Sequence, residues 1–269
     1  MPLRLADGAM GTWFAELTGL PVSRCEHANL EAPDRILSIH KAYLDAGARY
    51  IRSNTFSASV PGLGLPLPEV LRIVRAGFRL AREACLRSGC EEALPVADLG
   101  PGYDPVDPDG AAADPAERRQ ETGAILEAFL EEGARAFHFE TLADPGEADP
   151  ALEWLERNAP GIPSVVSFAI RPDGRSRKGH PLETLLAEAA RRPGVVGVGL
   201  NCGIGPGHLK ALLPRIPDLP LQVSLMPNAG YPGQEGGRTV FAASPAYFAE
   251  TAADCADILA GRSLLLGGC

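Results

Sequence analysis

The sequence lacks three features that would each assign it to a distinct class of protein. It has no run of about 18 consecutive apolar residues, which a membrane-spanning helix needs. It has no excess of basic residues: 25 Lys and Arg stand against 34 Asp and Glu, so binding to nucleic acid or to an anionic membrane is not expected. Its opening stretch, MPLRLADGAMGTW, lacks the apolar run of a signal peptide, so we expect a cytoplasmic protein.

The cysteines also lack a familiar pattern, because none of the six forms a C-x-x-C pair. In a cytosolic chain of this size, free thiols or metal ligands are more typical than disulfides. Spacing alone is weak evidence for a metal site. Which cysteines could bind a metal together depends on where the fold places them. They are Cys25, Cys85, Cys90, Cys202, Cys255 and Cys269.

Short apolar runs alternate with longer amphipathic segments along the chain. Several runs are nearly continuous in Val, Ile, Leu, Ala and Phe, which is typical of strands buried on both faces of a parallel sheet. The expected strands are 3–9, 49–56, 94–101, 136–142, 164–170, 195–202, 221–228 and 263–269. The expected helices are 33–46, 68–88, 115–133, 146–157, 181–191, 206–215 and 244–260.

Eight strands alternating with seven helices predict a (βα)8 barrel, an α/β fold of the TIM type, in one domain over residues 1–269. The alternative is an open doubly wound sheet, but the G-x-G-x-x-G turn that usually follows its first strand is absent. A complete barrel has eight helices. Here either the final helix is missing or something else covers the gap beside the first and last strands. The stretches 101–119 and 230–240, rich in Pro and Gly, are expected to be flexible loops.

Polar residues end nearly every expected strand, and barrel active sites lie at these carboxyl ends. We therefore expect the residues to converge at one mouth. Two of them are thiols from different strands, and two thiolates can hold Zn²⁺ with a position open for a substrate thiol, whose pKa the metal lowers. This arrangement points to alkyl transfer to sulfur. The residues are Asp7, Asn54, Asp98, Glu140, Ser167, Asn201, Cys202, Asn228 and Cys269.

Seven short motifs, taken together and in this order, resemble the homocysteine S-methyltransferase family. The resemblance covers essentially the whole chain and implies a (βα)8 barrel that transfers a methyl group to the thiol of L-homocysteine, giving methionine, with zinc as cofactor. The motifs are DGAMGT (7–12), SNTF (53–56), GPGYD (100–104), ET (140–141), GLNC (199–202), MPNAG (226–230) and GGC (267–269).

The resemblance also implies the metal ligands. Cys202 and Cys269 would bind zinc, and Asn228 would be an exchangeable ligand in the position that the substrate later takes. The family typically reads GGCC, and its second cysteine is also a ligand, whereas this sequence stops after the first. Three interpretations stay open: the sequence is truncated; another group completes the shell, such as the carboxylate of Cys269 or a partner subunit; or the zinc site is lost.

The substrate contacts implied by the resemblance are Asp7 and Glu140 for the amino group of homocysteine, because an ammonium needs carboxylates, and Asn54 along the pocket. Relatives take the methyl group from betaine, from S-methylmethionine, or from cobalamin and folate carriers. The motifs look closer to cobalamin-dependent methionine synthase modules and to barrels fused to folate reductases than to the S-methylmethionine users. Such a donor would require a separate donor-carrying protein. The rival hypotheses are a non-catalytic or zinc-deficient barrel that binds a thiol amino acid or a partner protein, and a methyltransferase that acts on selenocysteine.

Overall fold

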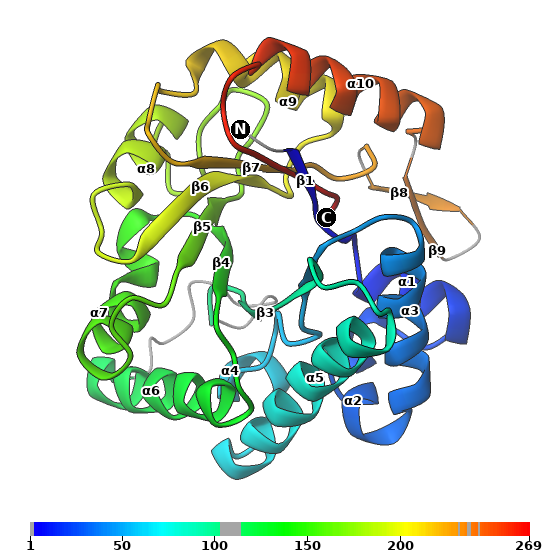
Figure 1. The fold of residues 1–269 in the computed structure, drawn as a ribbon, viewed down its shortest axis with the longest axis vertical. Helices are drawn as coiled ribbons and strands as arrows, with labels where there is room; N and C mark the ends of the chain where they lie inside the picture. Colours follow the sequence, from blue (N-terminus) through cyan, green and yellow to red (C-terminus); the bar gives the residue numbers. More distant parts are fainter. Residues whose placement is uncertain (1–2, 103–113, 231, 236–237, 242) are drawn as a thin grey trace.

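Eight parallel strands form one sheet in the computed structural model, which describes residues 3–102, 114–230, 232–235, 238–241 and 243–269. The sheet order is β1-β10-β7-β6-β5-β4-β3-β2. In Figure 1 the strands ring the centre of the molecule and the helices lie outside them. The strands are β1 (Leu3–Leu5), β2 (Tyr50–Arg52), β3 (Leu94–Leu99), β4 (Phe137–Leu142), β5 (Ser164–Phe168), β6 (Val195–Asn201), β7 (Gln222–Met226) and β10 (Leu264–Leu266).

The two edges of this sheet meet, so the predicted (βα)8 barrel is confirmed. A parallel bridge joins Ala6 to Tyr50. On either side of it, the Arg49 amide donates to the Leu5 carbonyl at 2.8 Å and the Asp7 amide to the Tyr50 carbonyl at 3.0 Å. Closure therefore rests on a short contact between β1 and β2, whereas β5 pairs with β6 over five residue pairs.

The seven expected helices are all present between the strands. Their starts follow ordinary capping chemistry: the Asp114 carboxylate accepts from the Ala116 amide, and the Ser244 hydroxyl accepts from the Tyr247 amide. They are α3 (Pro33–Asp45), α5 (Leu67–Arg87), α6 (Pro115–Glu131), α7 (Asp149–Asn158), α8 (Leu182–Ala189), α9 (Pro206–Leu212) and α10 (Pro245–Ile258).

Several short helices were not predicted from the sequence. The first begins at Gly11 and ends at Thr18, and both are weak helix formers. Burial of Phe14, which is 1% exposed, holds it against α3 and α5 instead. The extra elements are α1 (Gly11–Thr18), α2 (Ala28–Glu31), α4 (Val60–Leu63) and the 3-10 turns η1 (Val22–Arg24), η2 (Pro145–Ala148) and η3 (Leu213–Arg215).

The expected loop at 230–240 is wrong as stated, because this stretch contains an antiparallel hairpin. Its strands are β8 (Pro232–Glu235) and β9 (Arg238–Phe241), with Gly233 opposite Val240. The Thr, Val and Phe residues of 238–241 favour strands, but the glycines nearby made the stretch look like a loop. Most of the other expected loop, 103–113 within 101–119, lies outside the described residues.

The core has two concentric layers. Outside the strands, aromatic rings of Phe78, Phe129 and Phe137 meet edge to face, with centroids 5.8 and 5.9 Å apart. Inside the barrel, one side chain from most strands fills the centre, as packed barrels require. The inner layer is Ala6, Tyr50, Val96, Ala136, Val165, Met226 and Leu265.

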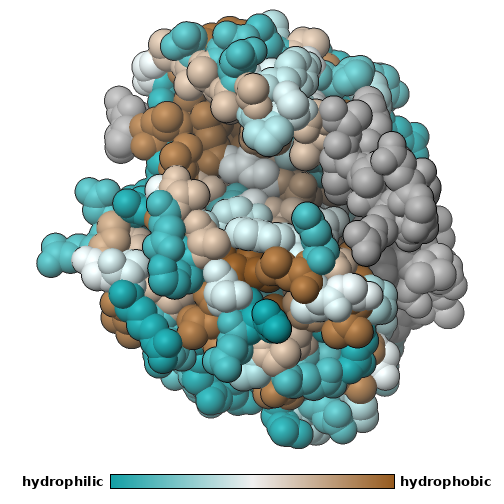
Figure 2. Space-filling view, turned by 90° about the vertical axis from the view of Figure 1, so that its right-hand side faces the viewer, coloured by the Kyte–Doolittle hydropathy of each residue, from teal (hydrophilic) through white to brown (hydrophobic). Residues whose placement is uncertain are grey.

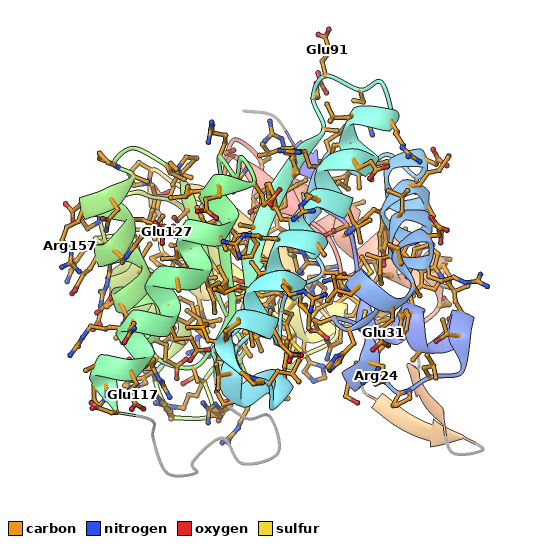
Figure 3. The ribbon with its side chains drawn as sticks, turned by 90° about the horizontal axis from the view of Figure 1, so that it is seen from below. Arg24, Glu31, Glu91, Glu117, Glu127 and Arg157 are labelled. Atoms are coloured by element: carbon orange, nitrogen blue, oxygen red, sulfur yellow. The ribbon has the colours of Figure 1, made fainter. Side chains whose placement is uncertain are left out.

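Among the coloured residues on the face in Figure 2, hydrophilic side chains surround separate hydrophobic patches. Charged side chains of the helices, such as Glu127 of α6 and Arg157 of α7, point away from the barrel (Figure 3). On the outside of β1, Leu3 and Leu5 are 53% and 44% exposed, so no helix of the described chain covers this strand. No helix among the described residues is long and apolar enough to cross a membrane.

We predict that His40→Leu makes the fold less sensitive to acid. His40 is fully buried on α3, and burial lowers its pKa to about 3, whereas a histidine in an unfolded chain titrates near 6.5. Between these pH values only the unfolded state binds the proton, so stability falls as the pH falls. From pH 7 to pH 5, His40 should remove about 2 kcal/mol from the free energy of unfolding.

Urea unfolding at both pH values measures this effect. The loss between pH 7 and pH 5 should be about 2 kcal/mol smaller in His40→Leu than in the wild type. His27→Leu, at a partly exposed site, controls for the removal of a histidine. Equal acid sensitivity of wild type and His40→Leu would contradict the prediction.

Candidate active site at the carboxyl ends of the strands

The two cysteines singled out by the sequence lie on either side of one strand. Cys202 follows β6, Cys269 follows β10, and β7 lies between these two strands. The Cys202 amide donates to the Met226 carbonyl and the Cys269 amide to the Pro227 carbonyl, both at 3.0 Å. The backbone at the end of β7 therefore holds both cysteines.

The two thiols are in contact. A hydrogen bond from the Cys269 side chain is the main reason that the pKa of Cys202 falls to about 7; burial opposes it, and a hydrogen bond from the Asn228 side chain adds to it. The same contact and burial raise the pKa of Cys269 well above its usual range. Cys202 is thus the more acidic thiol of the pair, and Cys269 the hydrogen-bond donor.

The backbone at this point is strained, as it often is at functional sites. Cys202 has a φ of 56° and Thr141, next to Glu140, has a φ of 63°. They are the two non-glycine residues with left-handed backbone among those described. Close approach also explains one glycine of the GGC motif, because a Cβ on Gly267 would lie 2.6 Å from the Asp7 carbonyl oxygen.

The two predicted acids meet across the barrel mouth, but an arginine lies between them. Arg52, the last residue of β2, donates from Nε to Asp7 Oδ1 at 2.8 Å and from Nη1 to Glu140 Oε2 at 2.5 Å. All three side chains are at most 8% exposed. Burial raises the pKa of Asp7 to about 6 and the guanidinium opposes this shift; burial lowers the pKa of Arg52, but Glu140 and Asp7 raise it overall, so Arg52 stays charged.

Arg52 also ties this ion bridge to the cysteines. Its Nη2 donates to the carbonyls of Gly268 and Gly8, at 2.9 and 3.3 Å. The sequence analysis missed this residue. The available signal was an arginine directly after Tyr50 and Ile51 in an expected strand, since a buried arginine needs partners.

Polar residues behind Glu140 hold it in place. The Asn201 amide nitrogen lies 3.4 Å from Glu140 Oε2, and its oxygen accepts from the Thr141 amide and the Ser167 hydroxyl at 2.8 and 2.9 Å. Ser167 in turn lies 2.9 Å from His138 Nε2. His138 is therefore a packed residue of the barrel interior, in line with the structural role expected from the sequence.

Asp98 lies beside this acid pair. Burial, and next the negative charge of Glu140, raise the pKa of Asp98 well above its usual range. Asp98 also hydrogen-bonds Glu140, and the direction of this shift favours the neutral form of Asp98 over a further charge at the mouth.

Asn54 faces another part of the structure. Its Nδ2 donates to the Cys25 carbonyl and to Asn29 Oδ1, both at 2.8 Å, and its Oδ1 accepts from the Cys25 thiol at 3.1 Å. These bonds fasten the segment between α1 and α2 to the end of β2. The expectation that Asn54 lines a substrate pocket stays a prediction.

For a metal, the described residues contain no group of three or more His, Cys, Asp and Glu side chains that could hold an ion together. The available donors are the two thiols and Asn228, whose side chain contacts Cys202. Two thiols and a neutral amide at a barrel mouth, next to a buried bridge of charges, form the candidate site.

Comparison with known protein families identifies the family of this chain. The family model described as homocysteine S-methyltransferase matches residues 4–269. The chain belongs to the homocysteine S-methyltransferase family. The resemblance that the motifs indicated is thereby confirmed.

Relatives in this family differ greatly in length. The methionine synthase of Mycobacterium leprae is 30% identical over 98% of this chain, and that match covers 23% of the relative. Homocysteine S-methyltransferase 4 of Zea mays is 27% identical, over 74% of this chain and 64% of the relative. This chain thus spans about a quarter of the length of the methionine synthase that it matches.

Among solved structures, the metallated form of the homocysteine methyltransferase MmuM from Escherichia coli has the same fold. The two superpose with a TM-score of 0.75 over 100% of this chain and 92% of that one, at 22% identity.

We predict that Asn54→Ala destabilises the fold. The variant leaves the Cys25 carbonyl and Asn29 Oδ1 without a buried donor, which should lower the free energy of unfolding by about 3 kcal/mol. Urea unfolding measures the loss. Asn158→Ala, which removes an exposed amide bonded to the Trp154 carbonyl, should change stability by less than about 0.5 kcal/mol. Equal stability of the two variants would show that Asn54 has no anchoring role.

Proposed function

We propose that this protein transfers a methyl group to the sulfur of L-homocysteine, giving methionine, with the help of Zn²⁺. The observation that carries the proposal is the contact between the Cys202 and Cys269 thiols at the mouth of a barrel of this family. Asp7, Arg52 and Glu140 lie at the same mouth and offer charged groups to the polar end of an amino acid. Homocysteine has these two parts, a thiol and a charged end.

The residues that would hold zinc are Cys202 and Cys269, with Asn228 as an exchangeable third ligand. This donor set fits the metal, because thiolates are preferred zinc ligands and catalytic sites combine three protein ligands with an open position. The lowered pKa of Cys202 favours the thiolate. Bound zinc lowers the pKa of an acceptor thiol, so that it reacts as a thiolate at neutral pH.

The chain's own contribution is alignment. The β7 carbonyls fix the separation of the two cysteines, and the ion bridge tied to Gly268 fixes the polar end of the pocket relative to them. The methyl donor then approaches from the open side of the mouth, because displacement at a methyl carbon requires the sulfur and the leaving group on opposite sides.

For the donor, we propose a methyl group carried by cobalamin or folate. The support is the extent of similarity: the methionine synthase match covers 98% of this chain and the plant homocysteine S-methyltransferase match covers 74%. Betaine and S-methylmethionine are the alternatives that an assay has to include.

We predict that the reduced protein binds about one zinc ion per chain and that Cys202→Ala abolishes this binding, because a thiolate is lost from the site. Elemental analysis after dialysis against limiting zinc measures the content. Cys255→Ala is the matched control, since Cys255 is another buried cysteine, on α10, and is not an assigned ligand. Unchanged zinc in Cys202→Ala, or an equal loss in the control, would exclude the assigned ligands.

We further predict that methionine forms from homocysteine with one of four donors: methylcobalamin, methyltetrahydrofolate, betaine or S-methylmethionine. Cys202→Ala should lower the rate by more than about 100-fold, while Cys255→Ala should not. Mass spectrometry of the product provides the measurement. Zinc binding without methionine from any donor would favour the rival hypothesis of a non-catalytic barrel.

A further inference from the structure

Three carboxyl groups share the mouth of the barrel with one guanidinium. Asp7, Glu140 and Asp98 are each at most 5% exposed, and Arg52 donates to the first two of them. Asp98 is the acid to which the proposed function gives no role. We propose that Asp98 carries a proton in the free protein and releases it to water when the ammonium group of the acceptor binds beside Glu140. The inference rests on the proposed function, because it concerns the acceptor of that same site.

The backbone of Asp98 is fixed near the end of β3. Its amide donates to the Ser53 hydroxyl at 3.1 Å, and its carbonyl accepts from the Thr55 hydroxyl at 2.7 Å. Both hydroxyls belong to the SNTF motif that follows β2. The carboxyl group of Asp98 therefore has a fixed place beside Glu140, to which it is hydrogen-bonded.

The hydrogen bond between these two acids requires a proton. An ionised carboxylate can only accept, so one carboxyl group of a bonded pair has to be the donor. Glu140 Oε2 is paired with the guanidinium of Arg52 at 2.5 Å, whereas Oδ1 of Asp98 has no hydrogen-bond partner among the described residues. The proton therefore belongs on Asp98. Burial, and next the negative charge of Glu140, shift the pKa of Asp98 in the same direction.

The groups that neighbouring elements bring to Asp98 supply no second positive charge within the described part of the chain. On β4, His138 is paired with Asp98 in the strand register; burial and next Arg52 lower its pKa well below the usual range, so it is neutral. On β2, Tyr50 is a phenol whose pKa is raised by burial and next by Asp98. The residues that α5 buries against β3 are apolar apart from the Cys85 thiol.

The charge balance changes when an ammonium arrives. Ionised Asp7 and Glu140 together with Arg52 leave one negative charge, and an ionised Asp98 would make it two. An ammonium on Glu140 lies one hydrogen bond from Asp98, and an opposite charge about 4–6 Å away lowers a carboxyl pKa by about 1–3 units. The O–H bond of Asp98 then breaks, the proton goes to water, and the new carboxylate offsets the incoming positive charge.

This exchange makes acceptor binding depend on pH in a fixed direction. Because binding releases a proton, the affinity rises as the pH rises through the titration of Asp98. A fall of about one unit in the pKa of Asp98 corresponds to about a tenfold gain in affinity. Midway between the pKa values of the free and the bound protein, it also corresponds to about half a proton released per ligand bound.

Calorimetry on the zinc-loaded, reduced protein counts these protons, because the apparent enthalpy of binding changes with the ionisation enthalpy of the buffer in proportion to the protons exchanged. L-Methionine is the main ligand, since it has the ammonium group of homocysteine but no thiol proton. At about pH 8 or about pH 9, the wild type should release about half a proton or more per methionine bound. Asp7, whose pKa is about 6, is already ionised there.

Asp98→Asn removes the proton and keeps a hydrogen-bond donor for Glu140. The amide cannot ionise, so the variant should bind methionine and release at least about half a proton less than the wild type. The same difference should appear with homocysteine, whose thiol proton is released by both proteins. Asp218→Asn, at an exposed site between η3 and β7, is the matched control, with wild-type proton counts expected.

The wild-type measurement stands even if Asp98→Asn does not fold. Methionine that binds without releasing protons at either pH would overturn the inference and leave the proposed function intact. So would equal proton release by the wild type and folded Asp98→Asn. Failure of both methionine and homocysteine to bind would reject the acceptor site itself, and the inference with it.

Discussion

Closure of the sheet between β1 and β2 is the constraint on which the mouth of this barrel depends. The bridge from Ala6 to Tyr50 brings Asp7, just after β1, beside Arg52, at the end of β2. The ion bridge then extends to Glu140 on β4. Removing one partner from a buried set of charges costs about 3–5 kcal/mol because it leaves a buried charge unpaired, so losing any one of the three would disturb the contact between β1 and β2 as well as the site.

The site combines two kinds of support. The cysteines are positioned by backbone hydrogen bonds to β7, whereas the charged groups are positioned by side chains, with Asn201 and Ser167 behind Glu140. Arg52 joins the two parts through the Gly268 carbonyl. The thiol end and the polar end of the pocket therefore form one connected unit, which suits a reaction that depends on alignment.

Much of this fold follows from local sequence patterns. Apolar runs located all eight barrel strands and the amphipathic segments located the seven main helices, because both patterns are set by burial. Elements stabilised by distant contacts were missed: α1 depends on Phe14, not on its helix propensity, and the β8–β9 hairpin was hidden by glycines.

In the site, too, some features follow from the sequence and others depend on distant contacts. Strand-end topology correctly placed Cys202 and Cys269 together, since parallel strands all finish at one mouth. Topology could not show which way a side chain turns. Asn54 is bonded to Cys25 and Asn29, and Arg52 fills the space between the acids; both facts depend on packing across segments far apart in the chain.

The anchoring of both cysteines on β7 has a consequence for how such proteins can diverge. The acceptors are the carbonyls of Met226 and Pro227, and every amino acid carries a carbonyl. Substitutions in β7 that preserve its path would leave the sulfur atoms where they are. Selection on the thiol pair therefore constrains the path of this strand, whereas packing in the barrel core constrains the identity of residues such as Met226.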